Sequence, residues 1–450
     1  MSGAGRAQLA RCFRGETLGP SDPGYDAARK VWNGMVDRRP ALIAFCAGAD
    51  DVAAALDFGR RHALQVAVRS GGHNIAGCSV CDDGLVIDLS RMTGIAVDPV
   101  RRVARAEAGL TLGAFDAATQ AFGLATTMGV NSDTGIAGLT LGGGFGRLAR
   151  KHGLACDNLL AAELVTADGR RLRASAEENA DLFWGLRGGG GNFGIVTAFE
   201  YRLHPLGPTV LGGSVLYDAA QARAALGFYD RFARTAPDAL STDAALVTLP
   251  SGAPAVSFSV CYCGPPEEGE AVLQPLRRFG TPLEDRIGPR SYLEVQSAGD
   301  AVFPRGRRYF WKAQFLRELT GPAIEAMLGA YVGAPSSRAL AVLQQVGGAV
   351  ARVAPDATAY AHRDAAYDCF AIAIWDDPAE DAANLRWARD FWTALAPFAT
   401  GGVYANNLGE EGAARVRAAY GLNFPRLAAL KRQFDPANVF CRNQNIPISS

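Results

Sequence analysis

Three glycine-rich loops in the first 200 residues constrain this chain more than any other feature. The first, Arg69-Ser70-Gly71-Gly72-His73-Asn74, follows the apolar run 64–68. The other two span 142–146 and 188–194, and an apolar run lies close to each. Adjacent glycines allow positive φ angles and let successive N–H groups converge, as in anion-binding loops. One such loop could be an ordinary turn, but three predict backbone that approaches a long, doubly charged ligand at several places.

His73 adds a chemical constraint to the first loop. An imidazole beside an anion-binding loop is a nucleophile directed at a bound cofactor, although a turn with an incidental histidine remains the alternative. A dinucleotide fits the three loops, and FAD fits best if a histidine is to bond to its ring.

The composition is that of an ordinary globular protein. The 450 residues suffice for two or three domains, with 49% hydrophobic and 20% charged residues. The 45 basic and 45 acidic residues balance, which argues against a nucleic-acid or membrane-surface partner. No apolar run approaches a membrane span, no signal peptide is visible, and nine cysteines show no framework spacing. We therefore expect a cytoplasmic protein without a metal site, as a monomer or small homo-oligomer.

The hydrophobic period changes near residue 208. Before about residue 203, strands, helices and glycine loops alternate, as in α/β construction. After it, strictly alternating runs predict half-buried antiparallel strands at 255–263, 308–315, 340–346 and 369–375. Helices are predicted between them at 266–273, 321–332 and 381–395, the last with an apolar stripe of Leu385, Ala388, Trp392 and Leu395.

The motifs together resemble the berberine-bridge-enzyme-like FAD-linked oxidases of the vanillyl-alcohol-oxidase superfamily. The resemblance rests on the three glycine loops, Lys151-His152-Gly153-Leu154 with Asp157-Asn158, and a tail with Tyr404-Ala405-Asn406, 431–436 and Asn443-Gln444-Asn445-Ile446. It covers nearly the whole chain and is greatest for bacterial members that tailor secondary metabolites.

The resemblance implies an α+β fold with a PCMH-type FAD-binding domain that is split in the sequence. Residues 1–205 and 404–450 would form this domain, and 206–403 a substrate domain whose antiparallel sheet is covered by helices. His73 would carry the flavin through a covalent bond to its 8α-methyl carbon. The expected cofactor-binding residues are Arg69, Ser70, Gly71, Gly72, His73, Asn74, Gly129, Asn131, Thr134, Gly135, Gly138, Gly142, Gly143, Gly144, Gly146, Gly190, Gly191, Ile195, Val196, Tyr404, Asn406, Asn443 and Asn445.

The segment 129–135 departs from the family pattern. Many relatives place a cysteine where this chain has Asn131, and that cysteine forms a second bond to the flavin. Asparagine cannot form a thioether, so we expect a single tether through His73. Thr134 stands where relatives that reduce O2 quickly tend to have valine, which is nearly isosteric. It could also be only a turn residue.

Tyr404, in a Tyr-x-Asn motif, is the leading candidate for acid–base work, although a structural tyrosine is the alternative. Its ordinary pKa near 10 would have to be lowered for it to act as a base. The run 341–346 lacks the carboxylate that some relatives carry there as a base, which favours Tyr404 as the base in this chain. Tyr309, Trp311, Gln344 and Tyr367 are the predicted substrate-lining residues, and of Gln344 and Gln345 at most one can line the site.

These features predict an oxidase that passes a hydride from an alcohol, sugar or polyketide- or phenol-type molecule to FAD and then to O2, releasing H2O2. A flavin dehydrogenase with another acceptor and an inactive flavin-binding module remain alternatives. A nicotinamide-dependent dehydrogenase fits poorly. Such an enzyme has a single glycine loop that opens a helix in a βαβ unit, whereas this chain has three separated glycine loops.

Overall fold

The first sheet has three parallel strands and one antiparallel strand, and the first glycine loop begins where the parallel strand Val66–Arg69 ends. The computed structural model describes residues 6, 9 and 11–448. Strands β2 (Leu42–Phe45), β4 (Leu85–Asp88) and β3 (Val66–Arg69) run parallel, and β1 (Glu16–Leu18) pairs antiparallel with β2. Helix α3 (Ala49–Arg61) connects β2 to β3 and buries Val52, Ala55 and Leu56.

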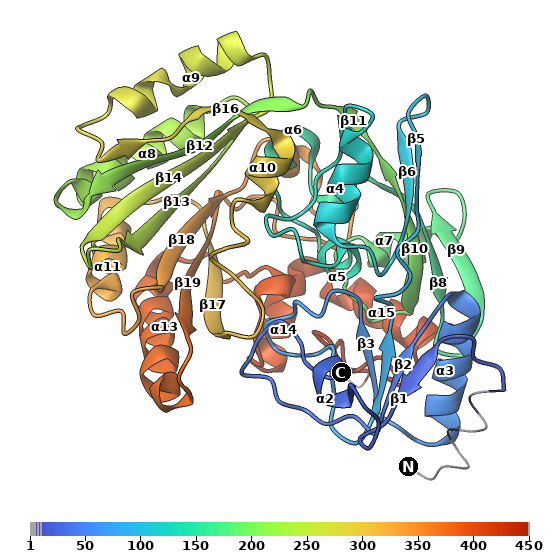
Figure 1. Cartoon of the computed structure of the whole chain (residues 1–450). Helices are drawn as coiled ribbons and strands as arrows, with labels where there is room; N and C mark the ends of the chain where they lie inside the picture. Colours follow the sequence, from blue (N-terminus) through green and yellow to red (C-terminus); the bar gives the residue numbers. More distant parts are fainter. Residues whose placement is uncertain (1–5, 7–8, 10, 449–450) are drawn as a thin grey trace.

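A second sheet in this part of the chain is wholly antiparallel (Figure 1). Its strand order is β5 (Ile95–Asp98), β6 (Val103–Glu107), β10 (Ile195–Arg202), β8 (Leu159–Val165) and β9 (Arg171–Ser175). The helices of this part of the chain are α2 (Tyr25–Ala28), α4 (Leu112–Gln120), α5 (Ile136–Leu141), α6 (Ala149–His152) and α7 (Ala180–Leu186). Strands β7 (Leu124–Ala125) and β11 (His204–Pro205) form a small antiparallel pair.

The central part of the chain forms an eight-stranded antiparallel sheet. Its order is β15 (Glu284–Asp285), β12 (Thr209–Asp218), β14 (Pro254–Tyr262), β13 (Leu240–Thr248), β18 (Leu340–Gln345), β19 (Tyr367–Trp375) and β17 (Arg308–Leu316), and β16 (Gly288–Ser291) also pairs with β12. Helices α8 (Ala222–Thr235), α9 (Pro266–Arg278), α11 (Gly321–Tyr331) and α13 (Asp381–Leu395) cover one face (Figure 1). Helix α10 (Tyr292–Ser297) lies beside α4, and α12 (Ala349–Arg352) lies beside α6.

The covered face of this sheet holds its own apolar core. Val256, Phe258 and Val260 of β14 pack there against the helices, as the alternation predicts. On α13, however, the buried residues are Asn384, Trp387, Ala388, Phe391 and Leu395. The predicted stripe was therefore wrong in part: the Trp392 ring lies over the Lys312 ammonium, with 3.6 Å between nitrogen and ring centroid.

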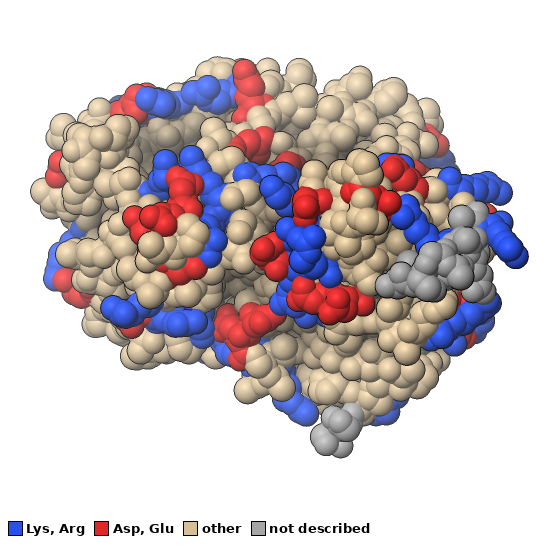
Figure 2. Space-filling model, turned by 60° about the horizontal axis from the view of Figure 1, so that its bottom comes forward, with Lys and Arg blue, Asp and Glu red and all other residues tan. Residues whose placement is uncertain are grey.

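The end of the chain returns to the first part. Helices α14 (Ala413–Tyr420) and α15 (Phe424–Phe434) follow Tyr404, and Leu408, Leu427 and Ile446 join the core built by the two N-terminal sheets (Figure 1). The division at 205/206 and 403/404 stays a prediction. On the face in Figure 2, basic and acidic side chains are interspersed. Within the described ranges, no helix is long and apolar enough to cross a bilayer.

Candidate active site

The first glycine loop and the segment 129–135 meet at their backbones. A Cβ atom on Gly71 would lie 2.3 Å from the Gly135 nitrogen, and one on Gly135 would lie 2.4 Å from the Gly71 nitrogen. Gly72 has φ +68°, so the loop turns through a conformation that favours glycine. Only glycine at both contact positions permits this approach, which brings His73 beside Asn131 and Asp133.

His73 lies in a polar and aromatic surrounding. Its Nε2 is 3.0 Å from Asp133 Oδ1 and 3.5 Å from Asn131 Nδ2. The Trp32 ring stacks on the imidazole with centroids 4.3 Å apart, and Tyr309 stacks on Trp32 at 3.8 Å. Tyr309 comes from β17, so the central sheet reaches the first glycine loop. Trp32 and Asp133 were missed at the sequence level because each depends on a contact distant in the chain.

Tyr404 lies beside the second glycine loop. Its phenolic oxygen accepts hydrogen bonds from the Gly144 N–H, at 2.9 Å, and from the Asn406 amide, at 2.8 Å. Gly143 and Gly144 have φ of +128° and +89°, and this turn directs the Gly144 N–H at the tyrosine. Asn406 also donates to the Leu139 carbonyl at 3.1 Å. The Tyr-x-Asn motif and the loop therefore form one hydrogen-bonded unit.

The environment of Tyr404 affects its acidity in opposite directions. Burial raises the pKa of its hydroxyl, and the hydrogen bonds from Gly144 and Asn406 lower it without offsetting the burial. The net shift is upward. The protein alone therefore does not supply the lowered pKa that Tyr404 would need to act as a base, because no cation contributes among the groups that shift it.

Asp368 on β19 is a second titratable group near Tyr404. It faces away from the helix layer, because its neighbours Tyr367 and Cys369 pack in that layer. Burial raises the pKa of Asp368 to about 7, although the Asn407 amide donates to its Oδ2 at 2.7 Å. Its Oδ1 has no partner among the described residues. The carboxylate sought in 341–346 thus lies on the adjacent strand, in register with Gln344.

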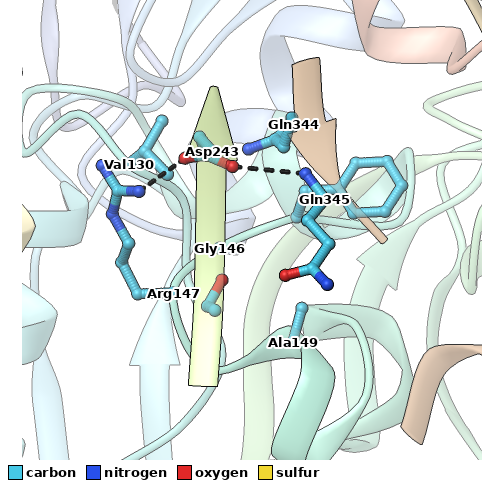
Figure 3. Close-up of a pocket in the computed structure, with 9 residues that line it drawn as sticks. Val130, Gly146, Arg147, Ala149, Asp243, Gln344 and Gln345 are labelled. Carbon is cyan, nitrogen blue, oxygen red and sulfur yellow. Dashed lines mark hydrogen bonds and ion pairs between the residues drawn. The ribbon is translucent and has the colours of Figure 1, made fainter. Parts of the chain in front are cut away.

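A narrow polar pocket lies between the second glycine loop and the inner face of the sheet (Figure 3). Arg147 donates to Asp243 Oδ2 at 2.6 Å, and the backbone N–H of Gln345 donates to Asp243 Oδ1 at 3.3 Å. The pocket is lined by Val130, Phe145, Gly146, Arg147, Ala149, Ser241, Asp243, Gln344 and Gln345. The Arg147–Asp243 pair was missed at the sequence level because its partners are 96 residues apart.

The predicted substrate-lining residues fall on both faces of the sheet. Tyr309 and Trp311 lie on the inner face in an apolar cluster with Trp32, and Gln344 lines the pocket. Tyr367 is a correction: it packs among the helices and its hydroxyl donates to Asp230 at 3.0 Å. The Gln345 side chain also faces the helices, where it donates to the Ala233 carbonyl, so only its backbone reaches the pocket.

Several predicted cofactor-binding side chains have structural partners instead. The Arg69 guanidinium pairs with the buried Asp88, the Ser70 hydroxyl donates to the Ala108 carbonyl at 2.6 Å, and Asn74 Oδ1 accepts the Cys78 N–H. Ile195 and Val196 are buried in the first core. The side chains of Arg69, Ile195 and Val196 therefore have partners within the protein, and cofactor binding by these residues stays a prediction.

The tail lies against the third glycine loop. Asn443 Nδ2 donates to the Gly191 carbonyl at 3.1 Å, and Asn192 Oδ1 accepts the Ile446 N–H at 3.1 Å. Gly190 has φ +71° and its Cβ position lies 3.4 Å from the Tyr420 hydroxyl. A cavity of about 300 Å³ beside the tail is lined in part by Ala76, Glu410, Asn443 and Asn445.

The remaining predicted positions are consistent with a long polar cofactor. Gly138 and Gly191 face open space, with no heavy atom within 4 Å of a Cβ position. Within the described residues, the buried oxygens Asn131 Oδ1, Asn443 Oδ1, Asn445 Oδ1 and the Tyr360 hydroxyl lack hydrogen-bond partners. Gly129 and Gly146 instead pack closely against Leu112 and the Met128 carbonyl, so they shape the loops. Buried polar atoms normally have partners, so these oxygens suit a ligand that supplies donors.

Comparisons with known proteins identify the cofactor and the family. Residues 40–175 match the FAD binding domain, and residues 403–447 match the family described as berberine and berberine like. An FAD-linked oxidoreductase of Dictyostelium discoideum is 33% identical over 93% of this chain and 91% of its own. The (R)-6-hydroxynicotine oxidase of Paenarthrobacter nicotinovorans is 34% identical over 96% and 97%.

A solved structure shows the same fold. The crystal structure of 6-hydroxy-D-nicotine oxidase from Arthrobacter nicotinovorans superposes with a TM-score of 0.90 at 32% identity, over 97% of this chain and 98% of that one. The expected α+β, PCMH-type architecture is thereby confirmed. The chain belongs to the berberine-bridge-enzyme-like family of FAD-linked oxidoreductases.

Proposed function

We propose that this enzyme is an oxidase in which FAD is tethered through His73 alone and a small neutral molecule is oxidised beside Tyr404. The observation that carries the proposal is the Tyr404 hydroxyl, which Gly144 and Asn406 hold between the second glycine loop and the inner face of the sheet. When bound, FAD would accept a hydride from a substrate carbon and pass the electrons to O2, giving H2O2.

The residues that would hold the cofactor lie on the three glycine loops and the tail. The close contact between Gly71 and Gly135 holds His73 beside the segment 129–135. Asn131 lies within 3.5 Å of the imidazole, where relatives carry the second attachment residue, and cannot form a thioether. This position supports a single covalent bond. The split FAD-binding domain at 1–205 and 404–450 belongs to the same proposal.

Proton transfer is assigned to Tyr404, with Asp368 as the second candidate. The two hydrogen bonds to the Tyr404 oxygen offset only part of the rise in its pKa that burial causes. Bound cofactor or substrate must therefore favour the phenolate, which then takes the proton of a substrate hydroxyl as hydride departs. Asp368 has a pKa of about 7 and a free carboxyl oxygen, so it can exchange a proton at neutral pH. Asn407 links Asp368 to the segment that carries Tyr404.

The pocket in Figure 3 has a volume of about 10 Å³, room for no more than a water molecule, so only its polar groups bear on the chemistry of the substrate. Arg147 is already paired with Asp243, so the pocket presents a neutral set of hydrogen-bonding groups with Gln344 and Ser241. Such a set recognises hydroxyl or carbonyl groups better than a free carboxylate, because an anion would have to displace Asp243. An alcohol, sugar or polyketide-type phenol satisfies this requirement.

Thr134 is proposed to leave room for dioxygen. Its side chain is half-buried, and the nearly isosteric valine leaves a similar volume. In stopped-flow reoxidation, anaerobically reduced wild-type enzyme should react rapidly with O2, and Thr134→Leu should react more slowly. Equal rates would exclude a role for Thr134, and a slow wild-type enzyme would identify a dehydrogenase with another acceptor.

The tether and the oxidase activity are tested together. Acid-precipitated wild-type protein should retain yellow colour, whereas His73→Ala should release its flavin into the supernatant. The holoenzyme is then screened with alcohols, sugars and polyketide-like phenols for flavin reduction and peroxide release. A colourless wild-type pellet would exclude the covalent bond, and flavin that no compound reduces would favour a binding module.

A further inference from the structure

We propose that Asp133 is a positioning residue that prepares His73 for its attachment to FAD. The inference rests on the proposed tether. It concerns how the imidazole becomes a nucleophile, and Asp133 acts through His73 rather than on the substrate.

The carboxylate of Asp133 selects one form of the imidazole. Asp133 Oδ1 lies 3.0 Å from His73 Nε2, so the neutral ring carries its proton on Nε2 and donates it to the carboxylate. Within the described residues, Nδ1 of His73 has no hydrogen-bond partner, and its lone pair is available to form a bond. A carboxylate hydrogen bond at one ring nitrogen also raises the basicity of the other.

Neighbouring residues fix both partners of this pair. Arg305 Nε lies 2.8 Å from Asp133 Oδ2, and its guanidinium also donates to the Gly71 carbonyl at 2.6 Å. Trp32 stacks on the imidazole with ring planes 23° apart and limits its rotation. Arg305 therefore ties Asp133 to the loop that carries His73, and the geometry is set before a cofactor binds.

The attachment then balances in atoms and electrons. His73 Nδ1 forms a bond to the 8α-methyl carbon of the flavin, and one C–H bond of that methyl breaks. The methyl proton and one proton from water end on the flavin, which takes up two electrons. Asp133 accepts the Nε2 proton and passes it to water, since its side chain is 38% exposed. Dioxygen then removes two electrons and two protons as H2O2.

Asn131 suits the product of this step. Once Nε2 has lost its proton it can only accept a hydrogen bond, and Asn131 Nδ2 lies 3.5 Å away as a donor. Asp133 thus accepts a hydrogen bond from His73 Nε2 before attachment, and Asn131 donates one to the same nitrogen afterwards.

The test follows covalent attachment rather than turnover. Protein produced without flavin is mixed with FAD, and the covalent fraction is measured over time as flavin fluorescence of acid-denatured protein on a gel. Non-covalent affinity is measured separately by fluorescence quenching. We expect Asp133→Asn to bind FAD with nearly the wild-type affinity but to attach it about 100-fold more slowly or worse, and Asp133→Glu to recover part of the rate.

Asp300→Asn is the matched control. Asp300 accepts a hydrogen bond from the Ser132 N–H at 2.9 Å, so it holds the same loop without contacting His73. Its attachment rate should stay within about threefold of wild type, a change under 1 kcal/mol. Equal slowing in both variants would assign the effect to loop placement and overturn the proposal, as would a wild-type rate in Asp133→Asn.

A second variant, Asp133→Ser, tests the proposal if Asp133→Asn does not fold. In Asp133→Ser, added formate should accelerate attachment, and no acceleration would count against the carboxylate. Wild-type protein without covalent flavin would refute the tether and this inference together. An enzyme that oxidises no tested compound but attaches FAD in an Asp133-dependent manner would refute only the assigned activity.

Discussion

At the scale of single residues, two tyrosines that the sequence analysis placed at the site have different hydrogen-bond partners. Tyr404 lies between a glycine-loop N–H and the Asn406 amide, whereas Tyr367 donates to Asp230 in the helix layer. Both are buried, but only Tyr404 has its oxygen held by two donors. The two donors lower the pKa of Tyr404 against the effect of burial, whereas the hydrogen bond to Asp230 raises the pKa of Tyr367 further, so proton transfer is expected at Tyr404.

Replacing each tyrosine by phenylalanine tests this difference. Tyr404→Phe should keep its bound flavin, and the rate of flavin reduction by substrate should fall about 100- to 10,000-fold, as when a general base is removed. Tyr367→Phe removes a tyrosine hydroxyl from the opposite face of the sheet, and in this variant substrate should reduce the flavin at the wild-type rate. Anaerobic stopped-flow absorbance measures both. A fast Tyr404→Phe variant would transfer the role to Asp368.

At the scale of elements, helices α4 and α10 meet around a buried carboxyl. Gln296 Nε2 donates to Asp116 Oδ2 at 3.0 Å and to the Gly129 carbonyl at 3.2 Å. Burial raises the pKa of Asp116 to about 7, while the Gln296 hydrogen bond lowers it. Because the effect of burial exceeds that of the hydrogen bond, the folded state is most stable when Asp116 is protonated.

This contact predicts a pH dependence of stability. Unfolded aspartate has a pKa near 3.9, so between about pH 4 and 7 the folded state binds more protons and the free energy of unfolding falls as pH rises. Asp116→Asn keeps the shape without the charge. By urea unfolding, the variant should exceed wild type by more than about 1 kcal/mol at pH 8 and match it near pH 4. A variant whose free energy of unfolding lies equally far below wild type at about pH 4 and at about pH 8 would contradict this prediction.

The elements themselves were largely predictable from local pattern. Strands 308–315 and 340–346 and helix 381–395 lie within one or two residues of β17, β18 and α13. Strands β12 and β13 were not predicted, because glycines and alternating small residues weaken their pattern. Asp368 was missed because the predicted strand began one residue later, at Cys369.

At the scale of the whole molecule, the site is assembled from segments far apart in the chain. The glycine loops were visible in the sequence because each is a local signal. The pairs Arg305–Asp133 and Arg147–Asp243 were not, because both link the central part of the chain to the first part. Arg363, 2% exposed, makes a third link: it forms two hydrogen bonds with Asp157, at 2.7 and 2.8 Å.

The Arg363–Asp157 pair should be a major contributor to the joined structure. Asp157 follows the second glycine loop, and Arg363→Met would leave its carboxylate with only the Leu154 N–H and the weak Cys156 thiol as donors. Removing one partner of a buried pair costs about 3–5 kcal/mol. Arg317→Met, in the exposed pair with Asp364, should cost less than about 1 kcal/mol. Urea unfolding compares the two variants, and adding Asp157→Asn to Arg363→Met should restore part of the loss. Similar small losses in both single variants would show that the two parts of the chain are joined by packing rather than by this buried pair.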